Sequence, residues 1–155
     1  MEEFNGKISA EFTPPKTWVL NKELSFKTNQ LTDSDIKILQ KVGANVNDEG
    51  QINCDKGMST DLASVPRACW AFIAPWDVAR AAVIHDHLYA SLRHYHNHVP
   101  NMDKKVWKKG RSLSDKIFLL GMQAAEPKVP FWKKYSAYKS VRVFGRWPAS
   151  KKTED

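Results

Sequence analysis

The sequence has little cysteine and no long apolar run, and each shortage excludes a class of protein. Its 155 residues include only two cysteines, Cys54 and Cys69, which are too few for a disulfide framework. Neither is spaced with histidine as in a structural zinc site. No apolar run reaches the roughly 18 to 20 residues of a membrane-spanning helix, and the acidic residues 1–7 lack the apolar segment of a signal peptide. We therefore expect a protein that is made in the cytoplasm.

The composition is that of a folded chain. Hydrophobic residues make up 42% of it and six are tryptophan, which is more apolar material than a disordered chain carries. A chain of this length usually forms one domain. We expect residues 1–149 to form that domain and residues 150–155 to be a flexible tail.

The positive charge lies almost entirely in the second part of the chain. Residues 1–92 carry 9 basic and 12 acidic residues, whereas residues 93–155 carry 15 basic and 5 acidic residues, a net charge of +10. A basic segment attracts anions, so we expect an anionic substrate or a membrane surface to dock there. Binding to nucleic acid is the weakest of these hypotheses, because only the charge favours it and no nucleic-acid-binding motif accompanies it.

The first third of the sequence has the pattern of short strands. Residues 18–26 mix β-branched, aromatic and alternating residues, and the turn-forming residues 47–50 lie inside a segment, 43–54, that is typical of a hairpin or a bulged ribbon. Both features predict a small antiparallel sheet. Asp33 and Asp35, ahead of an apolar stretch, are equally compatible with the cap of a helical turn.

The rest of the sequence has helical periodicity. Residues 77–92 contain no glycine or proline, and one face of this helix would carry residues spaced by three and four, namely Val78, Ala81, Ala82, His85 and Tyr89. We expect a polar loop at 93–101 and a second helix that begins at an N-cap, Ser112, and ends near residue 126. A basic third helix is expected at 131–144, with Gly145 and Pro148 ending it. The fold class predicted is α+β: a sheet, a helix pair and a basic C-terminal helix.

The most informative residues are His85 and Asp86, in the middle of an alanine-rich helix. Burying both groups there costs stability unless other residues satisfy them. His85 and Tyr89 share one helical face, and Asp86 points about 100° away. Asp115 on the next helix is a suitable carboxylate to hold the imidazole in one tautomer and to accept the Tyr89 hydroxyl. This arrangement is typical of a general base that activates water.

The motif His-Asp-x-x-Tyr at 85–89, with Asp-x-x-Phe at 115–118, resembles the catalytic core of phospholipase A2. It is most similar to the disulfide-free forms in bacteria and in parvovirus capsid proteins. The resemblance covers about 40 residues. It implies that His85 is the general base, Asp115 its orienting partner, Tyr89 a hydrogen-bonding support and Asp86 a calcium ligand.

A second resemblance covers roughly residues 18–146. The motif Thr-Asp-Leu-Ala-Ser-Val-Pro at 60–66, followed by 85–89, 115–118 and Met122, is similar to a domain family of unknown function that is widespread in tailed phages and prophages. This resemblance implies a phage-encoded protein that is made in the host cytoplasm. Incorporation into the virion, next to other virion proteins, is a further expectation.

A divalent metal is expected only if other residues help Asp86. Phospholipase A2 takes further calcium ligands from a glycine-rich loop, but the corresponding residues here, 72–77, contain no glycine. Calcium needs six to eight oxygens, so one carboxylate is not a site. Asp61 is the best candidate to complete the shell. The same carboxylates with a histidine would also suit magnesium, manganese or zinc.

The His85–Asp115 pair has two alternative interpretations. In the first, the chain is a hydrolase acting on an anionic ester such as a phospholipid. In the second, the pair is an interhelical clasp in a non-catalytic capsid or tail protein. Ser64 lacks the Gly-x-Ser-x-Gly context of a nucleophile, and the histidines at 94–98 are expected on a solvated loop. The aromatic residues of the basic segment are expected either on an interaction surface or packed inward beneath the lysines.

Overall fold

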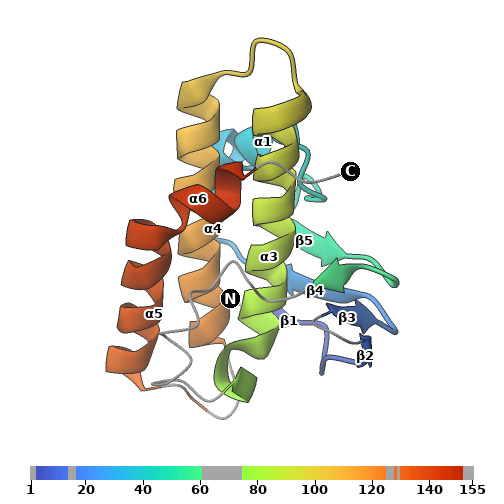
Figure 1. Cartoon of the computed structure of the whole chain (residues 1–155). Coiled ribbons are helices and arrows are strands. Elements are labelled where there is room, and N and C mark those ends of the chain that lie inside the picture. The colour runs from blue at the N-terminus through green and yellow to red at the C-terminus, as the bar shows by residue number, and fades with distance from the viewer. Residues whose placement is uncertain (1–2, 14–16, 61–74, 125–127, 129, 152–155) are drawn as a thin grey trace.

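The computed structural model describes residues 3–13, 17–60, 75–124, 128 and 130–151. Short antiparallel strands, interrupted by one helix, come first in the chain and the other helices follow, so the predicted α+β class is confirmed (Figure 1). The two longest helices run side by side, and the strands lie against one side of them (Figure 1).

The strands form two small antiparallel sheets rather than the single predicted sheet. One has the order β1-β4-β5 and the other the order β2-β3-β6. Their bounds are β1 Glu3–Phe4, β2 Ala10–Thr13, β3 Thr17–Leu20, β4 Leu24–Lys27, β5 Gln51–Cys54 and β6 Ser59–Thr60. The expected stretch at 18–26 is divided because the chain bends at Asn21 and Lys22, and asparagine favours turns. The bend sends its two halves into different sheets.

The predicted turn at 47–50 is present. The Asn47 side chain accepts hydrogen bonds from the backbone N–H groups of Glu49 (3.0 Å) and Gln51 (2.9 Å). Gly50 has φ +79°, a backbone conformation that glycine adopts without strain. Beyond the turn, Val46 makes an isolated bridge to Ile52 instead of a full strand, so this ribbon is short.

The segment with Asp33 and Asp35 is helix α1, Asp33–Lys41, which resolves the alternative that the sequence left open. Thr32 is its N-cap: the threonine hydroxyl accepts from the Asp35 backbone N–H, and the Asp35 carboxylate accepts from the Thr32 backbone N–H, both at 3.1 Å. This reciprocal capping box satisfies two backbone donors that would otherwise lack partners at the start of the helix.

The helix pair consists of α3, Pro75–His98, and α4, Lys104–Gln123, and both helices are longer than predicted. The prediction of a loop at 93–101 is wrong for most of its length, because α3 continues to His98. No glycine or proline interrupts the helix before Pro100. Ser112 is not the N-cap of α4. Asp103 caps it instead, and its carboxylate accepts from the backbone N–H groups of Lys105 (2.8 Å) and Val106 (3.3 Å).

The basic third helix is confirmed as α5, Phe131–Phe144, which ends at Gly145. A further helix, α6, spans Arg146–Ser150 and was not predicted. Pro148 lies in its first turn, where proline is tolerated because the backbone N–H there has no helical partner. Helix α6 is held on α3, since Arg93 Nη1 donates to the Pro148 carbonyl (3.1 Å) and Asn97 Nδ2 to the Lys151 carbonyl (2.9 Å). Ser150 is thus the last residue of α6, and residues 152–155 of the expected tail lie outside the described residues.

Close packing of α3 against α4 and the β1-β4-β5 sheet forms the core. Gly121 allows the close approach of the helices, because a Cβ atom there would lie only 2.9 Å from the Ala81 Cβ. On the side of α3 toward the sheet, buried apolar residues of the helix and of the strands form one cluster. The helix contributes Val83, Ile84 and Leu88, and the strands contribute Leu24, Phe26 and Ile52. In the part of the chain that the structure describes, no helix combines the length and the apolar character needed to cross a bilayer.

Candidate functional site

The structure brings together His85, Tyr89 and Asp115, as the sequence predicts. His85 Nε2 lies 2.8 Å from Asp115 Oδ1, and the Tyr89 hydroxyl donates to the same oxygen at 2.7 Å. The imidazole and the phenol ring also contact each other, with ring centroids 4.1 Å apart. All three residues have an exposed fraction of 0%. Helix α3 thus presents an imidazole and a hydroxyl to one carboxylate of α4.

Arg142 of helix α5 completes the group and was missed by the sequence analysis. Its Nη1 donates to Asp115 Oδ2 at 2.7 Å, so the second carboxylate oxygen also has a strong partner. Arg111, one turn before Asp115 on α4, lies 3.9 Å from the same oxygen. The i,i+4 spacing of Arg111 and Asp115 was visible in the sequence. Arg142 is the only arginine of its helix, and a guanidinium is the preferred partner of a buried carboxylate, but the sequence does not place it near Asp115.

These contacts keep the Asp115 carboxylate ionised. Burial by itself raises the pKa of Asp115, but the hydrogen bonds from His85, Tyr89 and Arg142, together with the charge of His85, outweigh it and hold that pKa below its ordinary value. Burial and the negative charge of Asp115 raise the pKa of Tyr89. Tyr89 therefore stays a hydroxyl donor over the ordinary pH range.

Gly145, at the corner between α5 and α6, packs directly on this group. A Cβ atom at that position would overlap the Tyr89 hydroxyl oxygen and the Val141 carbonyl oxygen. The absence of a side chain thus lets the corner approach the tyrosine. On another side, Phe118 of α4 contacts the His85 ring, with centroids 4.9 Å apart. The polar group is enclosed by three helices and their connection.

Asp86 faces a different partner, as its 100° offset on the helix predicts. The Thr60 hydroxyl, at the end of β6, donates to Asp86 Oδ2 at 2.5 Å, and both side chains are buried. Asp61, the expected second metal ligand, lies outside the described residues, as does Ser64. Within the described ranges no three His, Cys, Asp or Glu side chains are placed to share a metal ion. Asp86 by itself does not fit the coordination of calcium or magnesium.

The other candidate residues are placed differently from the predictions. His94, His96 and His98 belong to the last turns of α3, not to a loop. His87 is a separate case: its Nε2 accepts from the Asn45 backbone N–H at 3.2 Å. Burial lowers the pKa of His87, against the opposing charges of Asp55 and Asp86.

The aromatic residues of the basic segment divide between core and surface. Trp107 is buried, but Phe131 and Trp147 are 73% and 69% exposed. Helix α5 buries only Ala137 and Val141 in its contact with the core, a stripe too narrow to cover its large rings. Inward packing beneath the lysines is therefore wrong for most of these aromatic residues.

Comparison with known proteins gives a family but no characterised relative. The family described as protein of unknown function (DUF1353) matches residues 36–141, a span that includes His85, Asp86, Tyr89 and Asp115. No match was found among curated proteins or among solved structures. Since this match covers well over half of the sequence, the chain belongs to the DUF1353 family of proteins of unknown function.

Proposed function

We propose that this chain is a hydrolase in which His85 and Asp115 activate a water molecule for attack on an ester. The observation that carries the proposal is the contact of 2.8 Å between His85 Nε2 and Asp115 Oδ1. A carboxylate that accepts from Nε2–H fixes the tautomer in which the other ring nitrogen, Nδ1, is the basic atom.

The reaction follows from these roles. Asp115, kept ionised by its partners, holds the Nε2 proton, and Tyr89 fixes the carboxylate from the same side. Nδ1 takes a proton from water as the water oxygen attacks the ester carbonyl. The resulting imidazolium, stabilised by Asp115, returns the proton to the leaving alcohol as the carbon–oxygen bond breaks. Because the described residues do not form a metal site, no step is assigned to a metal.

The proposed substrate is an anionic ester, with a phospholipid as the first choice. The net charge of +10 in residues 93–155 would attract an anionic headgroup or surface. The resemblance of residues 85–89 and 115–118 to phospholipase A2 supports the same choice. The resemblance to proteins of tailed phages and prophages supports synthesis of the chain in a bacterial host from a phage genome.

Two observations favour a second function, in which the group is an interhelical clasp of a non-catalytic virion protein. His85 and Asp115 have exposed fractions of 0%, so water must enter before His85 acts as a base. Arg142 also neutralises the carboxylate that would stabilise an imidazolium. In this case the network connects α3, α4 and α5, and the exposed aromatic residues of α5 face another virion protein.

A single variant separates these functions. In the 155-residue chain, His85→Asn removes the base but keeps a polar side chain of similar size. For the hydrolase we expect turnover of a phospholipid and ester panel to fall on the order of 100-fold or more. Tyr89→Phe is the matched control, because it removes one hydrogen bond to Asp115 and keeps the base. Full activity in His85→Asn, or an inactive wild-type protein whose melting temperature falls sharply in that variant, would favour the clasp.

A further inference from the structure

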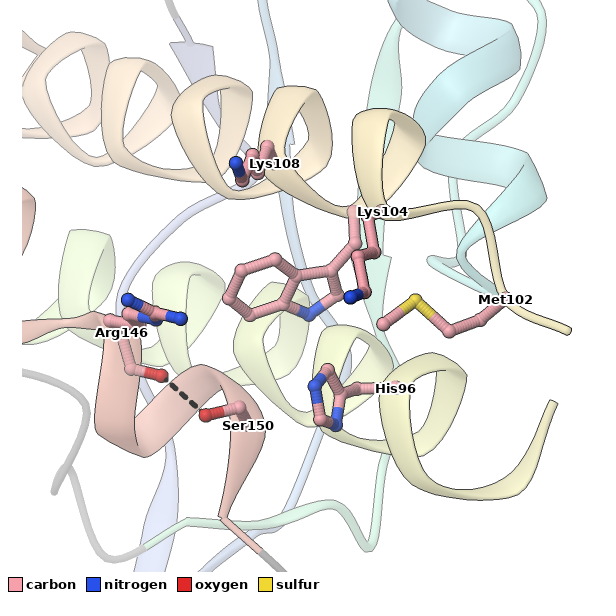
Figure 2. A pocket seen from close by; sticks show the side chains of 7 residues that line it. His96, Met102, Lys104, Lys108, Arg146 and Ser150 are labelled. Carbon is pink, nitrogen blue, oxygen red and sulfur yellow. Dashed lines mark hydrogen bonds between the residues drawn. The ribbon is translucent and has the colours of Figure 1, made fainter.

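A pocket lies at the far end of the helix pair, away from His85. Its cavity volume is about 430 Å³, and the last turns of α3, the first turns of α4 and helix α6 surround it (Figure 2). The lining residues are His96, Met102, Lys104, Trp107, Lys108, Arg146 and Ser150. Along α4, Trp107 is about 12 Å from Asp115 at 1.5 Å per residue. The pocket is large enough for a small organic ligand.

The side chains that line the pocket are either cationic or without a formal negative charge. Lys104 and Lys108 approach from α4 and Arg146 from α6, and none of the described residues that line the cavity is Asp or Glu (Figure 2). The nearest acidic residue along the chain, Asp103, uses its carboxylate to cap α4. Three cationic side chains around one hollow create a positive potential that favours an anion.

Trp107 provides an independent sign of a ligand. Its side chain is 6% exposed, and its Nε1–H is buried with no hydrogen-bond partner among the described residues. Leaving a buried donor without an acceptor is costly, so native proteins do so only rarely. The Nε1 atom is shielded from solvent, so a ligand in the pocket that Trp107 lines would supply the missing acceptor once the indole or a neighbouring side chain shifts.

We propose that this pocket binds a phosphate monoester. A phosphate carries close to two negative charges and three acceptor oxygens, which matches three cationic side chains and one indole donor better than a single carboxylate does. The planar guanidinium of Arg146 is suited to bidentate contact with phosphate. The volume exceeds that of phosphate itself, and Met102 with the His96 and Trp107 rings, 5.4 Å apart, offers apolar surface to the organic part.

The test uses the full-length protein and the six indole N–H signals that its tryptophans give in nitrogen-15 NMR spectra. Trp107→Phe identifies the signal of Trp107 by its disappearance. Glycerol 3-phosphate, added at an ionic strength of about 0.15 M, should shift that signal saturably. Glycerol, which lacks the phosphate, should not shift it.

Charge-matched double variants show whether the pocket or the net charge is responsible. Lys104→Gln with Lys108→Gln should weaken binding about tenfold or more, because two contacts to a charged ligand are lost. Lys105→Gln with Lys139→Gln removes the same charge from exposed positions outside the pocket and should leave the affinity within about twofold. An unmoved Trp107 signal, or equal losses in the two double variants, would overturn the proposal.

Two sources of the phosphate are then distinguished. Vesicles of phosphatidylcholine with phosphatidic acid carry the same monoester on a membrane. If the protein sediments with these vesicles and the Lys104→Gln with Lys108→Gln variant does not, the ligand is a lipid headgroup. Binding of glycerol 3-phosphate without sedimentation identifies a soluble phosphate ester. Neither result depends on His85, so the hydrolase proposal stands or fails separately.

Discussion

Arg142 Nη1 lies 2.7 Å from Asp115 Oδ2, while His85 Nε2 lies 2.8 Å from Oδ1 of the same carboxylate. Two residues from different helices therefore share one fully buried anion. The Tyr89 hydroxyl adds a third hydrogen bond. Through these hydrogen bonds Asp115 connects α3, α4 and α5.

Removing Arg142 should destabilise the protein because the buried Asp115 carboxylate loses a hydrogen-bond donor. Arg142→Met keeps much of the side-chain volume but leaves a buried carboxylate with fewer donors. We expect the free energy of unfolding, measured by urea denaturation, to fall by about 2 kcal/mol, less than for a fully buried pair because the arginine side chain is partly exposed. Lys139→Met, on the same helix and with the same change of charge, should lower it by less than about 0.5 kcal/mol.

The double variant Arg142→Met with Asp115→Asn checks the cause of that loss. An amide at position 115 carries no charge, so the absence of the guanidinium should matter less there. The effect of Arg142→Met should be at least halved in the Asp115→Asn background. Equal effects in both backgrounds would show that the arginine stabilises α5 by packing alone.

The close approach of Gly145 to Tyr89 predicts that even one methyl group is not tolerated. Gly145→Ala should lower the free energy of unfolding by about 1–3 kcal/mol, since overlap with two oxygen atoms forces the α5–α6 corner away from α3. Tyr89→Phe removes one of these oxygens, so alanine should be less costly in that background. If alanine costs the same in both, the contact with Tyr89 is not the source of the strain.

The capping box of α1 gives a local prediction. Thr32→Ala removes the hydroxyl that accepts from the Asp35 backbone N–H and should lower the free energy of unfolding by about 1 kcal/mol. Thr32→Ser keeps the hydroxyl and should have little effect. A loss in the serine variant as large as that in the alanine variant would indicate that the threonine methyl group, not the cap, is responsible.

The sequence predicted the candidate site better than the boundaries of the fold. The contact of His85 with Asp115 follows from spacing on two helices and from the need of a buried imidazole for a partner. Arg142 was not predictable in this way, because its contact depends on how α5 folds back across α4. Asp115 and Arg142 are 27 residues apart, and unlike His85 and Asp115 they do not belong to motifs that pair them.

The predicted helix ends were wrong for a related reason, because they also depend on contacts with distant parts of the chain. Ser112 and Asp103 are both residues that cap helices, and local preference does not choose between them. Asp103 is selected by its surroundings, since its own backbone N–H donates to the Tyr95 hydroxyl of α3 at 3.0 Å. The division of the strands into two sheets likewise depends on long-range pairing, such as that of β3 with β6.

His87 predicts a loss of stability in mild acid. Its pKa in the folded protein lies below the ordinary value of 6.5, mainly because of burial, so the unfolded chain binds the proton more readily. The stabilisation by neutral His87 is therefore fully present above pH 6.5 and declines as the pH falls toward the folded pKa. His87→Gln lacks this titration and keeps an acceptor for the Asn45 N–H. The free energy of unfolding is measured by urea denaturation at pH 7.5 and at pH 5, about one unit or more on either side of 6.5. Between these two pH values the wild-type protein should lose more stability than this variant. His98→Gln, at an exposed position, should follow the wild-type curve; parallel curves for wild type and His87→Gln would show that protonation of His87 is not coupled to unfolding.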